Sequence, residues 1–219
     1  MDDDEFHGNF AENYDVMADQ FRSLGGQVMF GLHFDHISPD ERIIDIGIGT
    51  GLGSFRYHRF GLEVYGVDIS KRMLEECERK GFARELRALD ITSESLPYPD
   101  AHFEHAICHG VLHLFGDLSG IFKEAVRVIR PGGTFAFNTM CYPNGGPLGE
   151  EVMRKDTRWG KKVSYHGKGY IREISNLHGL EELASLLYVG GIDTETDERY
   201  FNRAYLMRFS GKLKGTDPA

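Results

Sequence analysis

The feature that most constrains this chain is the stretch IIDIGIGTGLGSF, residues 43–55, where four glycines stand at every second position after an apolar run. Glycine in or beside a strand costs folding entropy, so its repeated use needs a structural reason. The pattern predicts a sharp turn at the end of a strand, in a place where side chains would occupy space that something else needs.

Apolar runs of strand length alternate with helical patterns over residues 42–140. One helix is expected from Ser70, a good N-cap, to Gly81, and another from Ser119 to Arg130, before the sequence PGG. Strands that alternate with helices predict a doubly wound α/β fold, with a mostly parallel sheet and helices on both faces. The expected strands are residues 42–48, 63–69, 85–91, 104–110 and 134–140.

The pattern changes after residue 140. Residues 141–172 are rich in glycine and charge and lack a sustained period, which predicts an insertion or cap inside a single domain of residues 1–219. Four apolar residues at helical spacing then predict a helix that ends at two glycines: Leu180, Leu183, Ala184 and Leu187. The segments 197–201 and 204–213 leave no room for a helix between them, so we expect them to form a C-terminal antiparallel hairpin.

In a doubly wound sheet, ligands bind beyond the carboxyl ends of the strands, and the first strand–helix turn is the usual cradle. The glycine stretch is not a P-loop, because no Gly-Lys-Ser/Thr follows it. A dinucleotide fingerprint would need glycine at position 52, which is Leu52. Asp45, two residues before Gly47, would repel a pyrophosphate, whereas it suits a ligand with a positive charge.

These residues resemble the class I S-adenosylmethionine-dependent methyltransferase family, particularly its small-molecule type, which includes enzymes of quinone biosynthesis. The likeness covers about residues 10–140, and the order and spacing of five motifs make it specific. The motifs are DIGIGTG (45–51), GVDIS (66–70), ALDIT (88–92), LPYPDAHFEHAICHGVLHLF (96–115) and VIRPGGTFAFN (128–138). The sequence departs from the family at Glu104, where Asp is commoner, and at Cys108-His109, where small hydroxylic residues are often found.

The resemblance implies S-adenosylmethionine as cofactor and S-adenosylhomocysteine as product. Asp45 would help to hold the ammonium of the cofactor, Asp68 would bind both ribose hydroxyls, and Met73 would lie beside the adenine. Asp90 would reach the adenine amino group. The cofactor-binding residues implied in this way are Tyr14, Asp45, Gly47, Gly49, Gly51, Asp68, Ile69, Met73, Asp90, Ile91, Cys108 and His109.

Methyl transfer from a sulfonium needs alignment and exclusion of water, and it needs a general base only if the acceptor keeps its proton near neutral pH. The candidates for a catalytic role are His109, His113 and Tyr14, because the end of the fourth strand and the N-terminal segment should border the methyl group. Residues 1–40 would form a helical lid, with Tyr14 facing inward. His105 and His109 would lie roughly 13 Å apart along a strand, so we expect no shared metal ion.

Composition and charge bear on whether the protein binds nucleic acid, spans a membrane or contains disulfides. The chain of 219 residues has a formal net charge of −9, which disfavours a nucleic-acid partner. No apolar run approaches the roughly 20 residues that span a membrane. Three separated cysteines without a Cys-x-x-Cys spacing, and a start that reads MDDDEF, favour a reduced, cytoplasmic protein.

Charge is unevenly distributed along the chain. Residues 1–20 hold seven acids and no Lys or Arg, whereas residues 154–172 hold seven bases and one acid. We expect the basic run to lie near the mouth of the site and to favour a small acceptor with negative charge. Two alternatives to a methyltransferase stay open at this point: a protein that binds S-adenosylmethionine without catalysis, and an NAD-dependent oxidoreductase.

Overall fold

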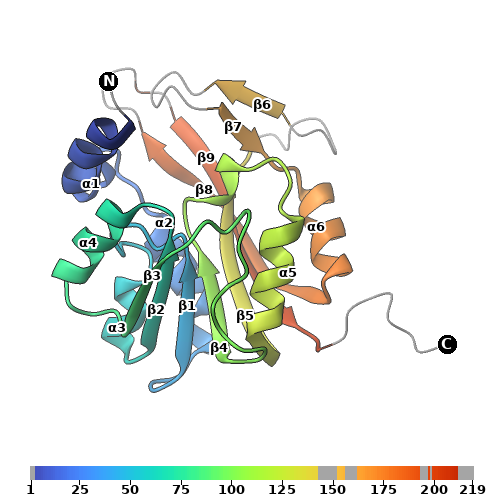
Figure 1. The fold of residues 1–219 in the computed structure, drawn as a ribbon. Coiled ribbons are helices and arrows are strands. Elements are labelled where there is room, and N and C mark those ends of the chain that lie inside the picture. Colours follow the sequence, from blue (N-terminus) through green and yellow to red (C-terminus); the bar gives the residue numbers. More distant parts are fainter. Residues whose placement is uncertain (1–2, 143–151, 156–161, 193–196, 198, 212–219) are drawn as a thin grey trace.

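The computed structural model describes residues 3–142, 152–155, 162–192, 197 and 199–211. Its centre is a seven-stranded sheet with the order β3-β2-β1-β4-β5-β9-β8 (Figure 1). The strands are β1 (Arg42–Ile46), β2 (Glu63–Asp68), β3 (Glu85–Ala88), β4 (Phe103–Cys108), β5 (Ile129–Met140), β8 (Leu180–Ile192) and β9 (Arg199–Phe209). The pairs among β1 to β5 are parallel, and β9 is antiparallel to both β5 and β8. The predicted doubly wound sheet with a C-terminal antiparallel pair is confirmed.

Helices cover both faces of the sheet, and their apolar residues form two clusters. Met29, Tyr57 and Leu74 belong to the cluster on one face, and Phe122 and Ile171 belong to the cluster on the other. The helices are α1 (Asp3–Gln20), α2 (Gly25–His33), α3 (Phe55–Phe60), α4 (Lys71–Arg79), α5 (Ser119–Val128) and α6 (Lys168–Leu177), with short 3-10 turns at Phe34–His36 and Leu112–Leu114.

The central strands read as continuous apolar runs because both of their faces are buried. All six residues of β4 are buried, as are four of the five in β1. The helix expected after residue 70 is also observed, since the Ser70 hydroxyl accepts a hydrogen bond from the Met73 N–H at 3.3 Å. The helix after Ser119 ends at Val128, and Ile129 already belongs to β5, so the PGG sequence lies inside the strand.

The C-terminal third differs from the expectation in two places. The predicted helix over Leu180, Leu183, Ala184 and Leu187 is wrong, because residues 180–192 form β8. The segments 197–201 and 204–213 do not pair with each other: residues 199–209 form one strand, β9, which pairs with β8. A bulge in β8 at 182/184 breaks the alternation of the strand within this segment, and a second bulge follows at 189/191.

The segment 141–172 contributes a second, two-stranded sheet and a helix that sequence analysis missed. Strands β6 (Val152–Lys155) and β7 (Lys162–Tyr165) pair antiparallel, and α6 follows. In Figure 1, α1 and the β6–β7 pair lie at the same end of the large sheet, the upper end in this view. Residues 143–151 and 156–161 of the segment lie outside the described residues.

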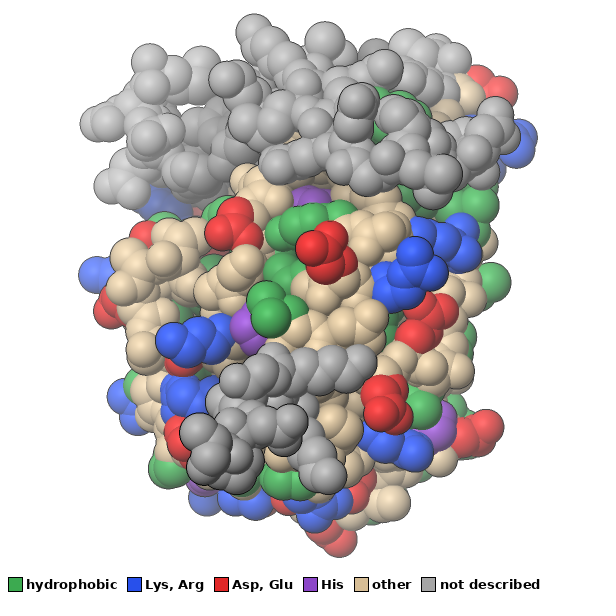
Figure 2. All heavy atoms as spheres, turned by 90° about the vertical axis from the view of Figure 1, so that its right-hand side faces the viewer, with side chains coloured by type: hydrophobic (Ala, Val, Ile, Leu, Met, Phe, Trp, Pro, Cys, Tyr) green, Lys and Arg blue, Asp and Glu red, His purple; other side chains and the backbone are tan. Residues whose placement is uncertain are grey.

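Seen from the right-hand side of Figure 1, the surface of the described residues mixes both signs of charge (Figure 2). Basic and acidic side chains are interspersed there, and neither sign gathers alone.

A buried polar chain joins β4 and β5 to α2. The Thr134 hydroxyl bonds to His105 Nδ1 at 2.7 Å and also to His33 Nε2, and His33 Nδ1 lies 3.2 Å from the Tyr57 hydroxyl. Burial lowers the pKa of both histidines, with the neighbouring His105 adding to the effect on His33. Both imidazoles are therefore neutral at pH 7, and one hydroxyl bridges them.

We expect Thr134→Val to destabilise the cofactor-free protein by about 2 kcal/mol or more, because a buried polar group left without a partner costs about 1–3 kcal/mol. Urea unfolding followed by circular dichroism measures the change, and Thr134→Ser, which keeps the hydroxyl, is the matched control. Equal stability of the valine variant and the native protein would show that the bridge contributes nothing.

Candidate functional site

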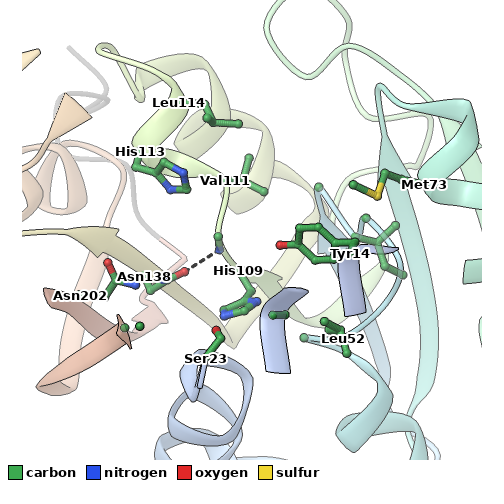
Figure 3. Close-up of a pocket in the computed structure, with 18 of the residues that line it drawn as sticks. Tyr14, Ser23, Leu52, Met73, His109, Val111, His113, Leu114, Asn138 and Asn202 are labelled. Carbon is green, nitrogen blue, oxygen red and sulfur yellow. Dashed lines mark hydrogen bonds between the residues drawn. The ribbon is translucent and has the colours of Figure 1, made fainter. Parts of the chain in front are cut away.

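A cavity of about 370 Å³ lies at the carboxyl ends of β1, β2, β4 and β5, against α1. Residues from distant parts of the sequence meet in its wall: the turn after β1, the turn after β2, the segment after β4, and the ends of β5, β8 and β9. Figure 3 shows Tyr14, Leu52 and Met73 on one side of it and Asn138, Asn202 and Ser23 on the other.

The turn after β1 has the geometry that the glycine pattern predicted. Gly47 and Gly49 have φ angles of +82° and +54°, which non-glycine residues rarely adopt. A side chain on Gly47 would come within 2.4 Å of Val111, whereas one on Gly49 would meet no protein atom within 4 Å. Both residues line the cavity, so the backbone itself forms this part of the wall.

Gly51, an expected cofactor-binding residue, is also constrained by packing within the protein. Its φ is +85°, and a side chain there would lie 2.5 Å from Phe82 and 2.9 Å from the Cys77 sulfur. Gly51 is therefore needed so that α4 and the residues after it can pack against the turn. It does not appear among the described residues of the cavity wall.

Asp45 lies at the base of the cavity and is 1% exposed. Its Oδ1 is buried and has no hydrogen-bond partner among the described residues. Burial raises the pKa of Asp45 to about 7, with the Ser54 side chain acting in the opposite direction and Asp68 adding to the rise. A buried carboxylate in this state would gain greatly from a cationic partner in the cavity.

The Asp68 carboxylate joins two turns. One oxygen accepts the Gly49 N–H at 2.8 Å and the other accepts the Ser70 N–H at 2.8 Å. Burial raises the pKa of Asp68, and these backbone N–H groups act in the opposite direction. Each oxygen has a further lone pair, so the carboxylate can also accept hydroxyl donors from a bound molecule.

Helix α1 is held over the cavity by a three-part contact. Asp15 accepts a hydrogen bond from the Thr50 hydroxyl at 2.6 Å and lies 2.5 Å from the Lys80 ammonium. Lys80 also donates to the Thr50 carbonyl at 2.7 Å. This contact joins α1, the glycine turn and the end of α4. On the same helix, Tyr14 lines the cavity, and burial raises its pKa, with Asp15 and Asp68 adding to the effect.

His109 follows β4 and lies between two glycines. A side chain on Gly25, at the start of α2, would come within 2.1 Å of His109 Nε2, and one on Gly53 would lie 3.1 Å from its Cβ. Burial alone lowers the pKa of His109 to about 4. The imidazole is therefore neutral at pH 7.

Several wall residues were not anticipated. Asn138 at the end of β5 accepts the Gly110 N–H at 2.8 Å and donates to the Tyr188 hydroxyl at 3.2 Å, which fixes the segment that carries His109. Asn202, Met140 and Tyr200 also line the cavity. An asparagine at the end of an otherwise apolar strand was a signal for Asn138, whereas Asn202 reaches the site only through the pairing of β9 with β5.

The structure brings together most, not all, of the expected site residues. Those in the wall are Tyr14, Asp45, Gly47, Gly49, Asp68, Ile69, Met73, His109 and His113. Asp90, Ile91 and Cys108 are absent from the described wall. The Asp90 carboxylate accepts hydrogen bonds from Thr92 and Ser93, Ile91 packs against the core, and Cys108 is fully buried.

Among the residues that the structure describes, no three of His, Cys, Asp and Glu gather in a way that could hold a metal ion. His105 bonds to Thr134 and Glu41, away from the cavity that His109 and His113 line.

Residues 44–137 match a family model described as a methyltransferase domain. The chain is 30% identical, over 146 residues, to a malonyl-[acyl-carrier protein] O-methyltransferase of Serratia marcescens, covering 67% of this chain and 55% of that protein. It is 29% identical, over 107 residues, to a demethylmenaquinone methyltransferase of Tropheryma whipplei, covering 49% of this chain and 45% of that protein. The chain belongs to the class I S-adenosylmethionine-dependent methyltransferases. It spans about half the length of these curated relatives.

Solved structures of low sequence identity share the fold of this methyltransferase domain. An S-adenosylmethionine-dependent methyltransferase of Methanosarcina mazei superposes with a TM-score of 0.65 at 19% identity, covering 80% of this chain and 95% of that one. A geranyl diphosphate C-methyltransferase of Streptomyces coelicolor, in complex with S-adenosyl-L-homocysteine, gives a TM-score of 0.66 at 16% identity, covering 84% of this chain and 74% of that one.

The cofactor of the family, S-adenosylmethionine, suits the cavity on this structure's own evidence. The unpartnered oxygen of Asp45 suits the ammonium of the cofactor, and the two oxygens of Asp68 suit ribose hydroxyls. Gly49, where a side chain would meet no protein atom within 4 Å, leaves room for a molecule against the backbone. Ile69, which is 70% exposed, and Met73 offer apolar surface for a base.

We expect the affinity for S-adenosylhomocysteine to fall about tenfold between pH 7.5 and pH 6. The ammonium of the ligand favours ionised Asp45, whose pKa is about 7 without ligand, so below that pH binding must release a proton. Isothermal titration calorimetry in buffers of different ionisation heats measures both effects. Asp45→Asn should bind more weakly and with a flat profile over this range; an equally steep profile in that variant would assign the proton to another group.

We also expect the contact between Asp15 and Lys80 to slow cofactor release. A partly exposed ion pair contributes about 0–1 kcal/mol, so Lys80→Ala should speed dissociation of S-adenosylhomocysteine up to about fivefold and leave global stability nearly unchanged. Stopped-flow fluorescence with a displacing ligand measures the rate. Lys71→Ala, at an exposed position of the same helix, is the control, and an equal change in both variants would contradict the idea.

Proposed function

We propose that this protein transfers a methyl group from S-adenosylmethionine to a small-molecule acceptor by in-line displacement. The observation that carries the proposal is the cavity itself. It joins Asp45, Asp68 and the glycine turn at one side to an uncharged polar region around His109 and Asn138 at the other. Its volume of about 370 Å³ lies in the range of small-molecule sites, and its two sides differ in chemistry.

The protein's contribution to the reaction would be alignment and the exclusion of water. The cofactor supplies a methyl group on a sulfonium with a good leaving group. Asp45, Asp68 and the glycine turn hold it in place, and effective molarities from such alignment are worth up to roughly 7–11 kcal/mol. In this proposal residues 1–40 form a lid, since Tyr14, Met17 and Phe21 of this segment line the cavity.

His109, His113 and Tyr14 remain the candidates for contact with the acceptor, since all three line the cavity. His109 is supported best, because its neutral imidazole can accept a hydrogen bond at pH 7. Asp90, Ile91 and Cys108 are kept as proposed cofactor-binding residues on the family resemblance alone.

The acceptor is proposed to be a small molecule, as the Streptomyces coelicolor protein's name indicates for that enzyme. An anionic acceptor would be captured through the basic run 154–172, part of the proposed cap 141–172. Val163 of β7 lines the cavity, so the backbone of the run borders the site. Arg158 and Lys161 lie outside the described residues.

We propose a cytoplasmic location and no nucleic-acid partner, in line with the net charge of −9. No helix in the described part of the chain is both long and apolar enough to cross a bilayer.

The test is binding of S-adenosylmethionine and S-adenosylhomocysteine by calorimetry, with NAD as a comparison, followed by a screen of acceptors that detects S-adenosylhomocysteine release. We expect one site per chain for both sulfur cofactors and none for NAD. Asp68→Ala should lower the affinity at least tenfold, since it removes charge-assisted hydrogen bonds of about 1.5–3 kcal/mol each.

Three outcomes separate the alternatives. Binding together with turnover supports the proposal. Cofactor binding without turnover of any acceptor would favour a non-catalytic S-adenosylmethionine-binding protein. Saturable binding of NAD, without binding of either sulfur cofactor, would favour an oxidoreductase.

A further inference from the structure

One side of the cavity carries uncharged polar side chains from four separate segments. Ser23 lies between α1 and α2, His109 follows β4, Asn138 ends β5, and Asn202 belongs to β9. We call these four residues the polar end of the cavity. Figure 3 shows them on the side opposite Tyr14 and Met73, where the resemblance to the family places the ribose and adenine of the cofactor.

The fold makes specific room for the His109 imidazole. Gly25 and Gly53 both lack the side chain that would collide with it. Asn138 holds the next residue, Gly110, through its backbone N–H at 2.8 Å. Three positions from three elements therefore determine where this ring lies.

The His109 side chain is partly exposed in the cavity wall, and no hydrogen bond to its ring nitrogens is found among the described residues. A neutral imidazole has one nitrogen that accepts a hydrogen bond. A ligand that fills the cavity and displaces water from this nitrogen must therefore bring an O–H or N–H donor.

The acids of the described wall, Asp45 and Asp68, lie at the cofactor side, and the described wall residues include no Lys or Arg. A carboxylate or phosphate placed at the polar end would find no ammonium or guanidinium of the described wall to compensate its loss of water. An uncharged group bonded to His109 carries no such cost.

The cavity wall also carries apolar side chains from several elements. Met17 and Phe21 contribute from α1 and the residue after it, Met140 from β5, Val163 from β7, and Leu114 from the segment after β4. A molecule that places a polar group at His109 would therefore have an apolar body.

We propose that the methyl acceptor has an apolar body and places an uncharged group at the polar end of the cavity, where an O–H or N–H of that group donates one hydrogen bond to the imidazole of His109. Any negative charge on the acceptor then lies outside the polar end, toward the mouth. This inference rests on the proposed function and concerns the polar end of the same cavity.

The experiment uses the full chain saturated with S-adenosylhomocysteine, and three probes of one shape: 4-butylphenol, 4-butylanisole and 4-butylbenzoate. Calorimetry at pH 7.5, where the phenol is uncharged, gives the three affinities. The phenol should bind at least tenfold more tightly than the anisole, which lacks the donor, and more tightly than the anionic benzoate.

Two variants test whether His109 is the residue that causes the preference for the phenol. His109→Leu should lower phenol binding to the level of the anisole and leave anisole binding within about twofold of its native value. Met140→Ala, in the apolar wall, should weaken both probes by the same factor.

A second pair of variants moves the imidazole without removing it. Gly25→Ala places a methyl group 2.1 Å from the present position of His109 Nε2, so the preference for phenol over anisole should be lost. Gly31→Ala in the same helix meets no atom within 4 Å and should keep the preference. Thermal unfolding checks that each variant is folded.

Equal binding of phenol and anisole, tighter binding of the benzoate, or an unchanged preference in His109→Leu would each overturn the inference. The titration with S-adenosylhomocysteine, done before the probes are added, tests the proposed function and not this inference. Its failure would count against the proposed function, whereas its success with no preference among the probes would count against this inference alone.

Discussion

The site depends on the Asp68 carboxylate, which accepts the N–H groups of Gly49 and Ser70 and so joins the turn after β1 to the turn after β2. The two turns come from neighbouring parallel strands, whose carboxyl ends meet at one edge of the sheet. Gly49 can take part because its φ is +54°. The same carboxylate that joins the two turns is the group expected to hold the ribose.

The first 140 residues were largely predictable because their constraints are local. A buried parallel strand reads as an apolar run, and a glycine that needs a positive φ has few substitutes. The roles of individual residues were less predictable. Gly51 looked like part of the ligand cradle, yet the packing of Cys77 and Phe82 requires it. Asp90 follows its strand as expected, yet its hydrogen bonds are to Thr92 and Ser93.

The C-terminal third could not be predicted in the same way, because its constraints are tertiary. The spacing of Leu180, Leu183 and Leu187 is helical, but the pairing with β9 makes residues 180–192 a strand. Helix α6 was missed, although Ile171 and Ile174 are buried one turn apart. The polar end of the cavity has the same origin, since Asn202 lies opposite Met140 of β5 and Tyr188 of β8 only because β9 lies between these strands.

The central claim is that one cavity holds the cofactor on the Asp45–Asp68 side and leaves its sulfur facing the polar end. A crystal structure of the complex with S-adenosylhomocysteine tests it most directly. The account predicts ribose hydroxyls within hydrogen-bond distance of both Asp68 oxygens, the ammonium at Asp45, and the sulfur facing His109. A ribose bound away from Asp68, or a sulfur that faces away from His109, would contradict it.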